Sequence, residues 1–255
     1  MGNNKATLLT KDKVELSYEH NKKGFSSLIV VCPGFFNSKK NRWMKNTVEV
    51  LSSDYDTLIF DFRGHGESKG LFTWLGKEHC DLEAILDFAK GFNYESIGIL
   101  AYSLGAAVSI NIAAKRDDIK SMILISSPMS FWEINYHFWE PEMLSDLKDN
   151  FECDWEGKGA RVSHFFTGKL KPIKEVKKIK NLPLFFIHGS RDWIIKDYHS
   201  QNLYEAASGI KAIEIIEGGL HAERLLQENP QKMKVLILDW FRKTLSKEVG
   251  NEMAA

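Results

Sequence analysis

Cysteine is scarce in this chain of 255 residues, where Cys32, Cys80 and Cys153 lie far apart and form no CxxC pair. Their number and spacing exclude a disulfide framework and a cysteine-based zinc site, and they fit reduced thiols in the cytosol. The sequence also lacks any apolar stretch long enough for a signal peptide or a membrane span. We therefore expect a soluble cytoplasmic protein with no stable membrane insertion.

An excess of either charge is also absent, because 34 basic residues balance 34 acidic ones. Because the charges balance, no overall electrostatic field attracts nucleic acid, and we do not expect it as a partner. No GxGxxG sequence or phosphate-binding loop opens a predicted helix, which excludes the common nucleotide sites. Four histidines also lack metal-ligand spacing: His79, His137, His164 and His199. We expect neither a cofactor nor a metal.

Short apolar runs alternate along the chain with segments of helical length. The predicted strands are Leu28–Cys32, Thr57–Phe62, Ser96–Leu100, Ser121–Ile125, Leu184–His188 and Ala212–Ile216. The predicted helices are Arg42–Leu51, Glu78–Lys90, Leu104–Lys115, Asp197–Ala206 and Pro230–Leu245. This alternation indicates an α/β fold, with a mostly parallel central sheet and helices on both faces. Stricter alternation at Val14–Tyr18 predicts an antiparallel edge strand before that sheet.

One long interval, between Ser127 and Leu182, shows no strand pattern. So long a connection in a compact α/β domain is usually an insertion with helices of its own. We therefore expect a cap at residues 128–180 and a core formed by residues 1–127 and 181–250. The cap contains aromatic residues and a run of lysines from Lys169 to Lys180. The aromatic residues either pack the cap against the core or line a pocket. The lysines either form a solvated face or bind an acidic substrate or a lipid surface.

The segment Ala101-Tyr102-Ser103-Leu104-Gly105 joins a predicted buried strand to a predicted helix. A serine at such a sharp corner needs small residues two positions before and after it, and Ala101 and Gly105 meet that demand. The corner places Ser103 at a helix N-terminus, where unpaired N–H groups and the helix dipole favour a developing anion. Ser103 is therefore the candidate nucleophile.

A serine nucleophile needs a base and an orienting carboxylate, and both follow later strands. Asp192 follows the predicted strand Leu184–His188, and His221 follows Ala212–Ile216 after two glycines. Carboxyl ends of parallel strands meet at one edge of the sheet, so these side chains are expected beside Ser103. Taken alone, Asp192 also fits a helix cap or a surface pair with Arg191, and His221 fits a capping or solvated histidine.

The order Ser, Asp, His, together with the loops Asp61-Phe62-Arg63-Gly64-His65-Gly66-Glu67-Ser68 and Pro33-Gly34-Phe35, resembles the α/β-hydrolases. Within them the chain is similar to the serine-aminopeptidase, monoacylglycerol-lipase and feruloyl-esterase-like branch. It departs from that branch at Ala101, where a glycine is usual, and at Pro33, where histidine is frequent.

This resemblance implies an α/β-hydrolase fold with a helical cap inserted after the sixth strand. It also implies that Ser103 attacks, His221 transfers the proton and Asp192 orients the imidazole, while the backbone N–H groups of Phe35 and Leu104 hold the oxyanion. The loop Arg63–Ser68 has a structural role in this interpretation. Further residues expected to contact the substrate are Phe36, Tyr102, Phe131, Trp132 and Trp139.

The sequence thus predicts a serine hydrolase that cleaves a small-molecule carboxylic ester with an apolar acyl group through an acyl-enzyme. Peptidase, thioesterase and acyltransferase reactions use the same three side chains and remain alternatives. A ligand-binding module without catalysis is a further one, although it has no need of all three residues. Haloalkane dehalogenase and epoxide hydrolase chemistry is disfavoured, because each needs a carboxylate where Ser103 stands.

Overall fold

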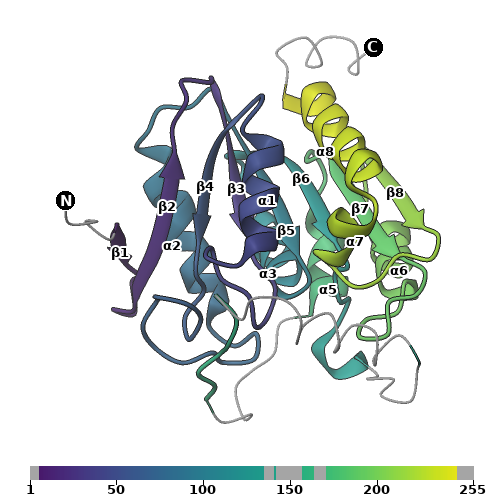
Figure 1. The fold of residues 1–255 in the computed structure, drawn as a ribbon, viewed down its shortest axis with the longest axis horizontal. Helices are drawn as coiled ribbons and strands as arrows, with labels where there is room; N and C mark the ends of the chain where they lie inside the picture. Colours follow the sequence, from purple (N-terminus) through teal and green to yellow (C-terminus); the bar gives the residue numbers. More distant parts are fainter. Residues whose placement is uncertain (1–5, 135–140, 142–156, 164–170, 246–255) are drawn as a thin grey trace.

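A computed structural model describes residues 6–134, 141, 157–163 and 171–245. It contains an eight-stranded sheet in the order β1-β2-β4-β3-β5-β6-β7-β8, drawn in Figure 1. The pairs from β4 through β3 and β5 to β8 are all parallel. The strands are β1 (Thr7–Leu9), β2 (Glu15–Asn21), β3 (Ser27–Cys32), β4 (Asp56–Phe60), β5 (Ser96–Tyr102), β6 (Ile119–Ile125), β7 (Leu184–Gly189) and β8 (Lys211–Ile216). The mostly parallel α/β sheet is confirmed.

The N-terminal side of the sheet differs from the prediction in one respect. Strand β2 pairs antiparallel with β4, as the alternation around Val14–Tyr18 predicted. It is not the edge strand, however, because β1 pairs with its outer side. Three residues are too few to show a clear alternation of apolar and polar side chains, so β1 left no usable signal in the sequence.

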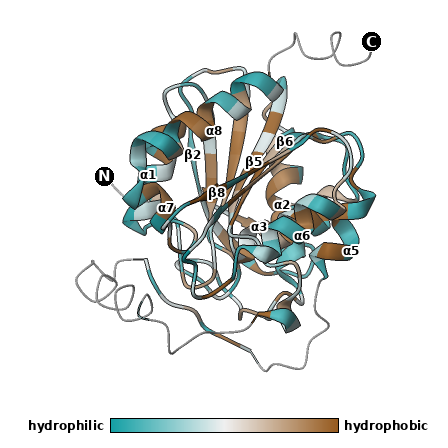
Figure 2. Ribbon diagram, turned by 90° about the vertical axis from the view of Figure 1, so that its right-hand side faces the viewer, coloured by the Kyte–Doolittle hydropathy of each residue, from teal (hydrophilic) through white to brown (hydrophobic). Residues whose placement is uncertain are grey.

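Helices cover both faces of the sheet, as Figure 2 shows from the side. On one face, α1 (Arg42–Leu51), α7 (Arg224–Glu228) and α8 (Pro230–Leu245) contribute side chains to a single buried cluster. On the other face, a second cluster includes side chains of α2 (Glu78–Lys90), α3 (Leu104–Ala113) and α6 (Tyr198–Ala206). Apolar residues on both sides of the strands therefore form the two halves of the core.

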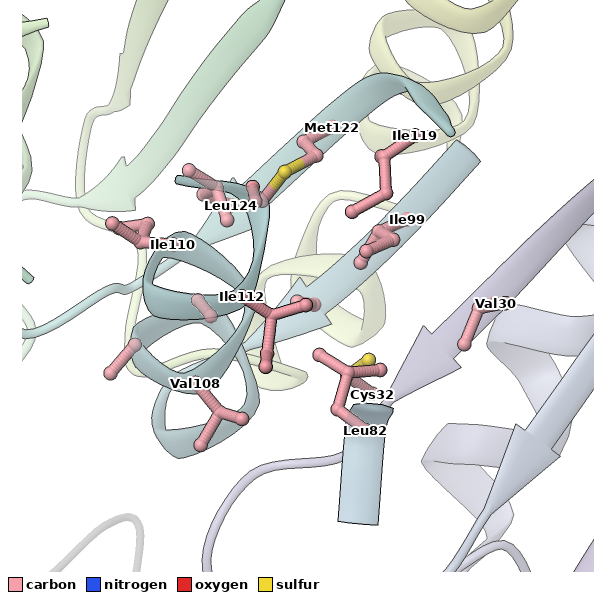
Figure 3. Packing of buried hydrophobic residues seen from close by; sticks show 14 of the residues in the cluster. Val30, Cys32, Leu82, Ile99, Val108, Ile110, Ile112, Ile119, Met122 and Leu124 are labelled. Atoms are coloured by element: carbon pink, nitrogen blue, oxygen red, sulfur yellow. The ribbon is translucent and has the colours of Figure 1, made fainter. Parts of the chain in front are cut away.

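Helix α3 packs unusually close to the sheet, because every residue from Leu104 to Ala113 is buried. Figure 3 shows Val108, Ile110 and Ile112 of this helix among side chains from the strands. At its start, a Cβ added to Gly105 would lie 2.5 Å from the carbonyl oxygen of Cys32. A larger residue there displaces the helix from β3, so the corner before α3 depends on this glycine.

The interval between β6 and β7 contains, within the described residues, two short 3-10 helices at Phe131–Glu133 and Val176–Lys178 and the one-turn helix α5 (Pro172–Glu175). Its residues 157–163 lie along the loop that follows β4, through the isolated bridges His65–Ala160 and Phe72–Val162. The lysines at 171, 174, 177, 178 and 180 are exposed. No helix among the described residues has the length and hydropathy needed to cross a membrane.

The loop after β4 is held by the buried carboxylate of Asp61. Its Oδ1 accepts from the backbone N–H of Lys39 at 2.7 Å, and its Oδ2 accepts from the N–H of Glu67 at 2.9 Å. A Cβ on Gly66 would lie 2.3 Å from the same Oδ2, so the turn around this carboxylate requires glycine. In the loop, His65 Nδ1 lies 3.1 Å from the carbonyl oxygen of Arg63. These contacts fix the conformation of the loop.

Burial of His65 links the stability of the fold to pH. The side chain is 0% exposed, and desolvation lowers the pKa of its imidazole to about 4. The unfolded chain takes up this proton near an ordinary pKa of about 6.5, whereas the folded chain does not, so stability falls as pH falls through this window. From pH 7 to pH 5 we expect His65 to lower the free energy of unfolding by about 2 kcal/mol.

Urea unfolding of the wild type and of His65→Gln at both pH values measures this loss. The variant is expected to lose about 2 kcal/mol less than the wild type between pH 7 and pH 5. Burial also lowers the pKa of His199 to about 4, so His199→Gln is expected to behave in the same way. An identical pH dependence in the wild type and both variants contradicts the assignment.

Candidate active site

Ser103 occupies the corner between β5 and α3 in a backbone conformation that L-residues rarely adopt, with φ 48° and ψ −112°. Its N–H donates to the carbonyl oxygen of Ile125 at 2.8 Å, which ties the corner to the end of β6. Gly34 lies against it, since a Cβ there would be 3.4 Å from the Cβ of Ser103. A strained serine held by neighbouring strands is typical of a functional position.

The loops after β7 and β8 bring Asp192 and His221 to the same edge of the sheet. A Cβ on Gly189 would lie 2.2 Å from the carbonyl oxygen of Gly219, so the two loops touch backbone to backbone. The N–H of Arg191 also donates to Gly219 O at 3.0 Å. Beyond His221, the N–H of Ala222 donates to Ser126 Oγ at the end of β6, at 3.0 Å. These bonds fix both loops relative to the sheet.

The three predicted side chains form one hydrogen-bonded chain. His221 Nε2 lies 3.1 Å from Ser103 Oγ, and His221 Nδ1 lies 2.6 Å from Asp192 Oδ2. Because a carboxylate only accepts, Nδ1 carries a hydrogen, which leaves Nε2 of the neutral ring as an acceptor for the Ser103 hydroxyl. The arrangement can remove a proton from Ser103 and later return it to another oxygen.

Asp192 is fully buried and accepts from four groups. The backbone N–H groups of Ile194 and Ile195 donate to its Oδ1 at 3.0 and 2.8 Å. Its Oδ2 lies 2.6 Å from His221 Nδ1 and 3.1 Å from His188 Nε2. Burial opposes charge on this carboxyl, but the two imidazoles outweigh that effect and hold its pKa well below the usual range. Its contacts are those of an orienting carboxylate and not of a cap on α6.

His188 is a second, buried imidazole on Asp192 that the sequence analysis did not identify. Its Nε2 also lies 2.7 Å from the carbonyl oxygen of Ile195, so two acceptors place the hydrogen on Nε2. Its Nδ1 lies 2.6 Å from the Oγ of Ser200, which holds the other side of the ring. His188 lies next to the end of β7 and four residues before Asp192, but this spacing alone predicts no contact between the two side chains.

A cavity of about 450 Å³ opens above Ser103. Most of its walls are aromatic or aliphatic, and the rings of Phe72 and Trp74 lie 5.0 and 5.7 Å from the ring of Phe35. Four lining residues carry amide or charged side chains: Asn37, Lys158, Glu223 and Arg224. An apolar cavity with a few polar groups beside a nucleophile is the usual form of a small-molecule site.

The residues predicted to contact substrate fall into three groups. Phe36 and Phe131 line the cavity. Tyr102 does not: its ring is fully buried in the cluster beneath α1 and α8, and its hydroxyl lies 2.8 Å from Thr47 Oγ1. Trp132 is 62% exposed and is also not among the lining residues. Trp139 lies outside the described residues.

The prediction for Tyr102 was wrong because side chains alternate along a strand. Ala101 lies in the cluster on the α3 face, so its neighbour Tyr102 belongs to the opposite face. The backbone turns into the cavity only at Ser103. Because Tyr102 directly precedes Ser103, its side chain lies on the far side of the sheet from the cavity.

Phe35 and Leu104, whose backbone N–H groups form the predicted oxyanion hole, both line the cavity. Leu104 is the first residue of α3, where an N–H has no partner within the helix. Among the described residues, neither N–H donates a hydrogen bond to another part of the protein. Within that part of the chain, both N–H groups are therefore free of a competing acceptor. Within the same residues, no group of three His, Cys, Asp or Glu side chains is arranged to hold a metal ion.

Comparison with known proteins places this geometry in context. A family profile described as "alpha/beta hydrolase fold" matches residues 27–167, more than half of the chain. Among solved structures, the esterase Pf2001 of Pyrococcus furiosus superposes with a TM-score of 0.76 at 24% identity, over 95% of this chain and 93% of that one. At this identity the likeness shows the fold alone.

Curated relatives match at lower coverage. The uncharacterized protein YqkD of Bacillus subtilis is 28% identical over 76% of this chain and 64% of its own length. The uncharacterized protein YfhR of Escherichia coli is 22% identical over 76% of this chain and 62% of its own. This chain thus matches less than two thirds of each relative. Ethanol acetyltransferase 1 of Hanseniaspora uvarum is 31% identical over 47% of this chain and 33% of its own length.

Proposed function

Because this chain belongs to the alpha/beta hydrolase family, we propose that it is a serine hydrolase that cleaves carboxylic esters with an apolar acyl group through an acyl-enzyme. The observation that carries the proposal is the hydrogen-bonded chain from Ser103 through His221 to Asp192, at the base of a largely apolar cavity. A non-catalytic binding module has no need of a strained serine aligned with a base and a buried carboxylate.

The proposed reaction begins when His221 Nε2 takes the proton of Ser103 and Oγ bonds to the ester carbon. The carbonyl oxygen becomes an anion and accepts from the N–H groups of Phe35 and Leu104. Collapse of this intermediate expels the alcohol oxygen, which takes the proton from His221 Nε2. Water then gives a proton to His221 Nε2 and attacks the acyl-enzyme. The bond between Oγ and the acyl carbon breaks, His221 returns the proton to Ser103 Oγ, and the acid is released.

Asp192 has an electrostatic role in this sequence. Its carboxylate stabilises the imidazolium that forms when His221 holds two protons. Since its own pKa is held well below the usual range, it does not take the proton from His221. The four donors around it support this role, because each stabilises the charged form of the carboxyl.

The acyl group is proposed to contact the aromatic wall of the cavity. Phe35, Phe72, Trp74 and Phe131 form a continuous series of ring contacts, the last between Trp74 and Phe131 at 6.2 Å. Such a wall binds an apolar chain by removing its surface from water. In this proposal, residues 128–180 act as the cap, which supplies Phe131 and shields the intermediate from bulk water.

Acyl transfer to an alcohol is the second candidate function, because one matching relative is named an ethanol acetyltransferase. An acyl-enzyme on Ser103 can be released by an alcohol as well as by water, with His221 as the base in both cases. The two candidates differ only in the acceptor. Peptidase and thioesterase reactions differ from them in the leaving group.

Hydrolysis of p-nitrophenyl esters, from acetate to long acyl chains, tests the proposal. We expect turnover with a preference for acyl chains longer than acetate, and labelling of Ser103 by one equivalent of an alkyl fluorophosphonate, located by peptide mass spectrometry. Added ethanol separates the candidates, because hydrolysis yields mainly the free acid and acyl transfer yields mainly the ethyl ester. No turnover of any ester, with Ser103 unlabelled, contradicts the proposal.

A further inference from the structure

A carboxylate lines the cavity without any part in the reaction described above. Glu223 lies two residues after His221 and immediately before α7. Its Oε1 accepts from Asn37 Nδ2 at 2.6 Å. Its other oxygen, Oε2, has no hydrogen-bond donor within the part of the chain that the structure describes. A carboxylate in a mainly apolar cavity needs donors for both oxygens, so Oε2 is left with unused acceptor capacity.

Asn37 holds Glu223 in a fixed orientation and is itself short of a donor. Asn37 is 6% exposed, and its N–H donates to Gly34 O at 3.4 Å within the loop that passes Ser103. Since the carboxylate can only accept, the Asn37 amide presents Nδ2 to Glu223 and Oδ1 away from it. That Oδ1 is buried and has no hydrogen-bond partner among the described residues. The pair therefore leaves two acceptor atoms without a donor in that part of the chain, and Glu223 is the member that a molecule in the cavity can reach.

The position of this pair indicates which part of a substrate it meets. His221 Nε2 has to protonate the departing alcohol oxygen, so the alcohol portion lies on the His221 side of the cavity. Glu223 belongs to the loop of His221, and Asn37 follows the oxyanion residue Phe35 by two positions. Three of the four rings in the aromatic wall proposed for the acyl group, those of Phe72, Trp74 and Phe131, come from other segments, and only Phe35 shares the loop of Asn37.

We propose that Glu223, held by Asn37, is a specificity-determining residue that binds a hydrogen-bond donor on the alcohol portion of the ester. The preferred substrates then combine an apolar acyl group with an alcohol that carries a further O–H or N–H group. This inference rests on the proposed function. Most of the cavity wall is apolar, which makes the burial of an ammonium group costly and favours a neutral hydroxyl as the donor.

Three butyrate esters test this proposal. 2-Hydroxyethyl butyrate and n-propyl butyrate differ only by a hydroxyl in place of a methyl group, and the protonated 2-(dimethylamino)ethyl ester offers a charged N–H. The release of butyric acid by the wild type is followed by titration at constant pH. We expect kcat/KM for the hydroxyethyl ester to exceed that for the propyl ester about tenfold, since a hydrogen bond to a charged group has roughly this value.

Glu223→Gln is the matched variant, because it keeps the size of the side chain and reverses the polarity at the cavity. Its Oε1 still accepts from Asn37, so an NH₂ group replaces the free carboxylate oxygen. We expect the ratio of hydroxyethyl to propyl kcat/KM to fall from about ten to about one. Glu217→Gln removes the same charge from an exposed position on the same loop, and is expected to keep the wild-type ratio.

The outcomes are distinct. A wild type that turns over the propyl and hydroxyethyl esters equally overturns the inference and leaves the proposed function standing. An unchanged ratio in Glu223→Gln, or an equal loss on both esters, also overturns it, because Glu223 then acts on the catalytic groups or the fold. A preference for the dimethylaminoethyl ester assigns the donor to ammonium and contradicts the choice of hydroxyl. A wild type inactive on every ester overturns the proposed function and this inference together.

Discussion

Ser103→Ala is expected to lower kcat/KM for ester hydrolysis on the order of 10⁶-fold, which is the typical effect of removing the nucleophile of such a group of residues. The variant keeps the cavity and the two backbone N–H groups, so substrate still binds while Oγ is missing. Among the described residues, the side chain of Ser103 bonds to His221 alone, and we therefore expect the melting temperature to change little. Initial rates on a p-nitrophenyl ester, with matched thermal unfolding curves, measure both effects.

Ser109→Ala is the control for this experiment. Ser109 lies six residues further along in α3, and its Oγ donates within the helix to Gly105 O at 2.7 Å. Removing it eliminates a buried serine hydroxyl of the same helix without touching His221, so activity is expected to stay within about twofold of the wild type. Equal activity in Ser103→Ala and the wild type contradicts the assignment of the nucleophile.

Asp192→Asn is expected to lower kcat on the order of 10⁴-fold, because it reverses the tautomer of His221. The N–H groups of Ile194 and Ile195 both donate to Oδ1 and need an acceptor there. The asparagine therefore keeps its oxygen at that position and turns its NH₂ group toward His221. The Nδ1 of His221 then has to accept, so its hydrogen moves to Nε2 and the ring can no longer take the proton of Ser103.

Single-turnover rates of Asp192→Asn measure this loss apart from product release. Asp197→Asn, on the same loop at the start of α6, removes a carboxylate whose bond is to Gln201 Nε2 at 3.1 Å. It is expected to retain nearly full activity, since Asp197 does not contact the imidazoles. A loss of less than tenfold in a folded Asp192→Asn protein means that Asp192 does not set the tautomer of His221.

For helices with a strong periodic or capping signal, the sequence predicted the first and last residues correctly. Helices α1, α2 and α8 begin and end where expected, and Gly91 directly follows α2. Asn41 explains the start of α1, because its side chain accepts from the N–H of Trp43. Helix α3 ends two residues earlier than predicted, at Ala113, since a buried run of small residues gives no periodic boundary.

The candidate site was predictable where it depends on topology, and not where it depends on packing. The order of strands places Ser103, Asp192 and His221 at one edge, so their meeting follows from the sequence pattern. The pair formed by Asn37 and Glu223 joins residues from different loops, and the buried contact of His188 with Asp192 joins a strand residue to the loop that follows the strand. Neither contact leaves a periodic signal, and each depends on distances that only the folded chain defines.

The order of the strands also determines how this protein loses activity when it is heated. The proposed nucleophile Ser103 follows β5, Asp192 follows β7 and the proposed base His221 follows β8, with β6 between β5 and β7. These strands form the half of the sheet that Figure 1 shows beside α8. Partial unfolding that releases β8 separates base from nucleophile while most of the sheet persists. Fraying of the distant β1–β2 edge leaves the catalytic geometry intact. Thermal inactivation therefore reports on one half of the molecule: it precedes global melting if the β8 edge unfolds first, and coincides with global melting if the β1–β2 edge does.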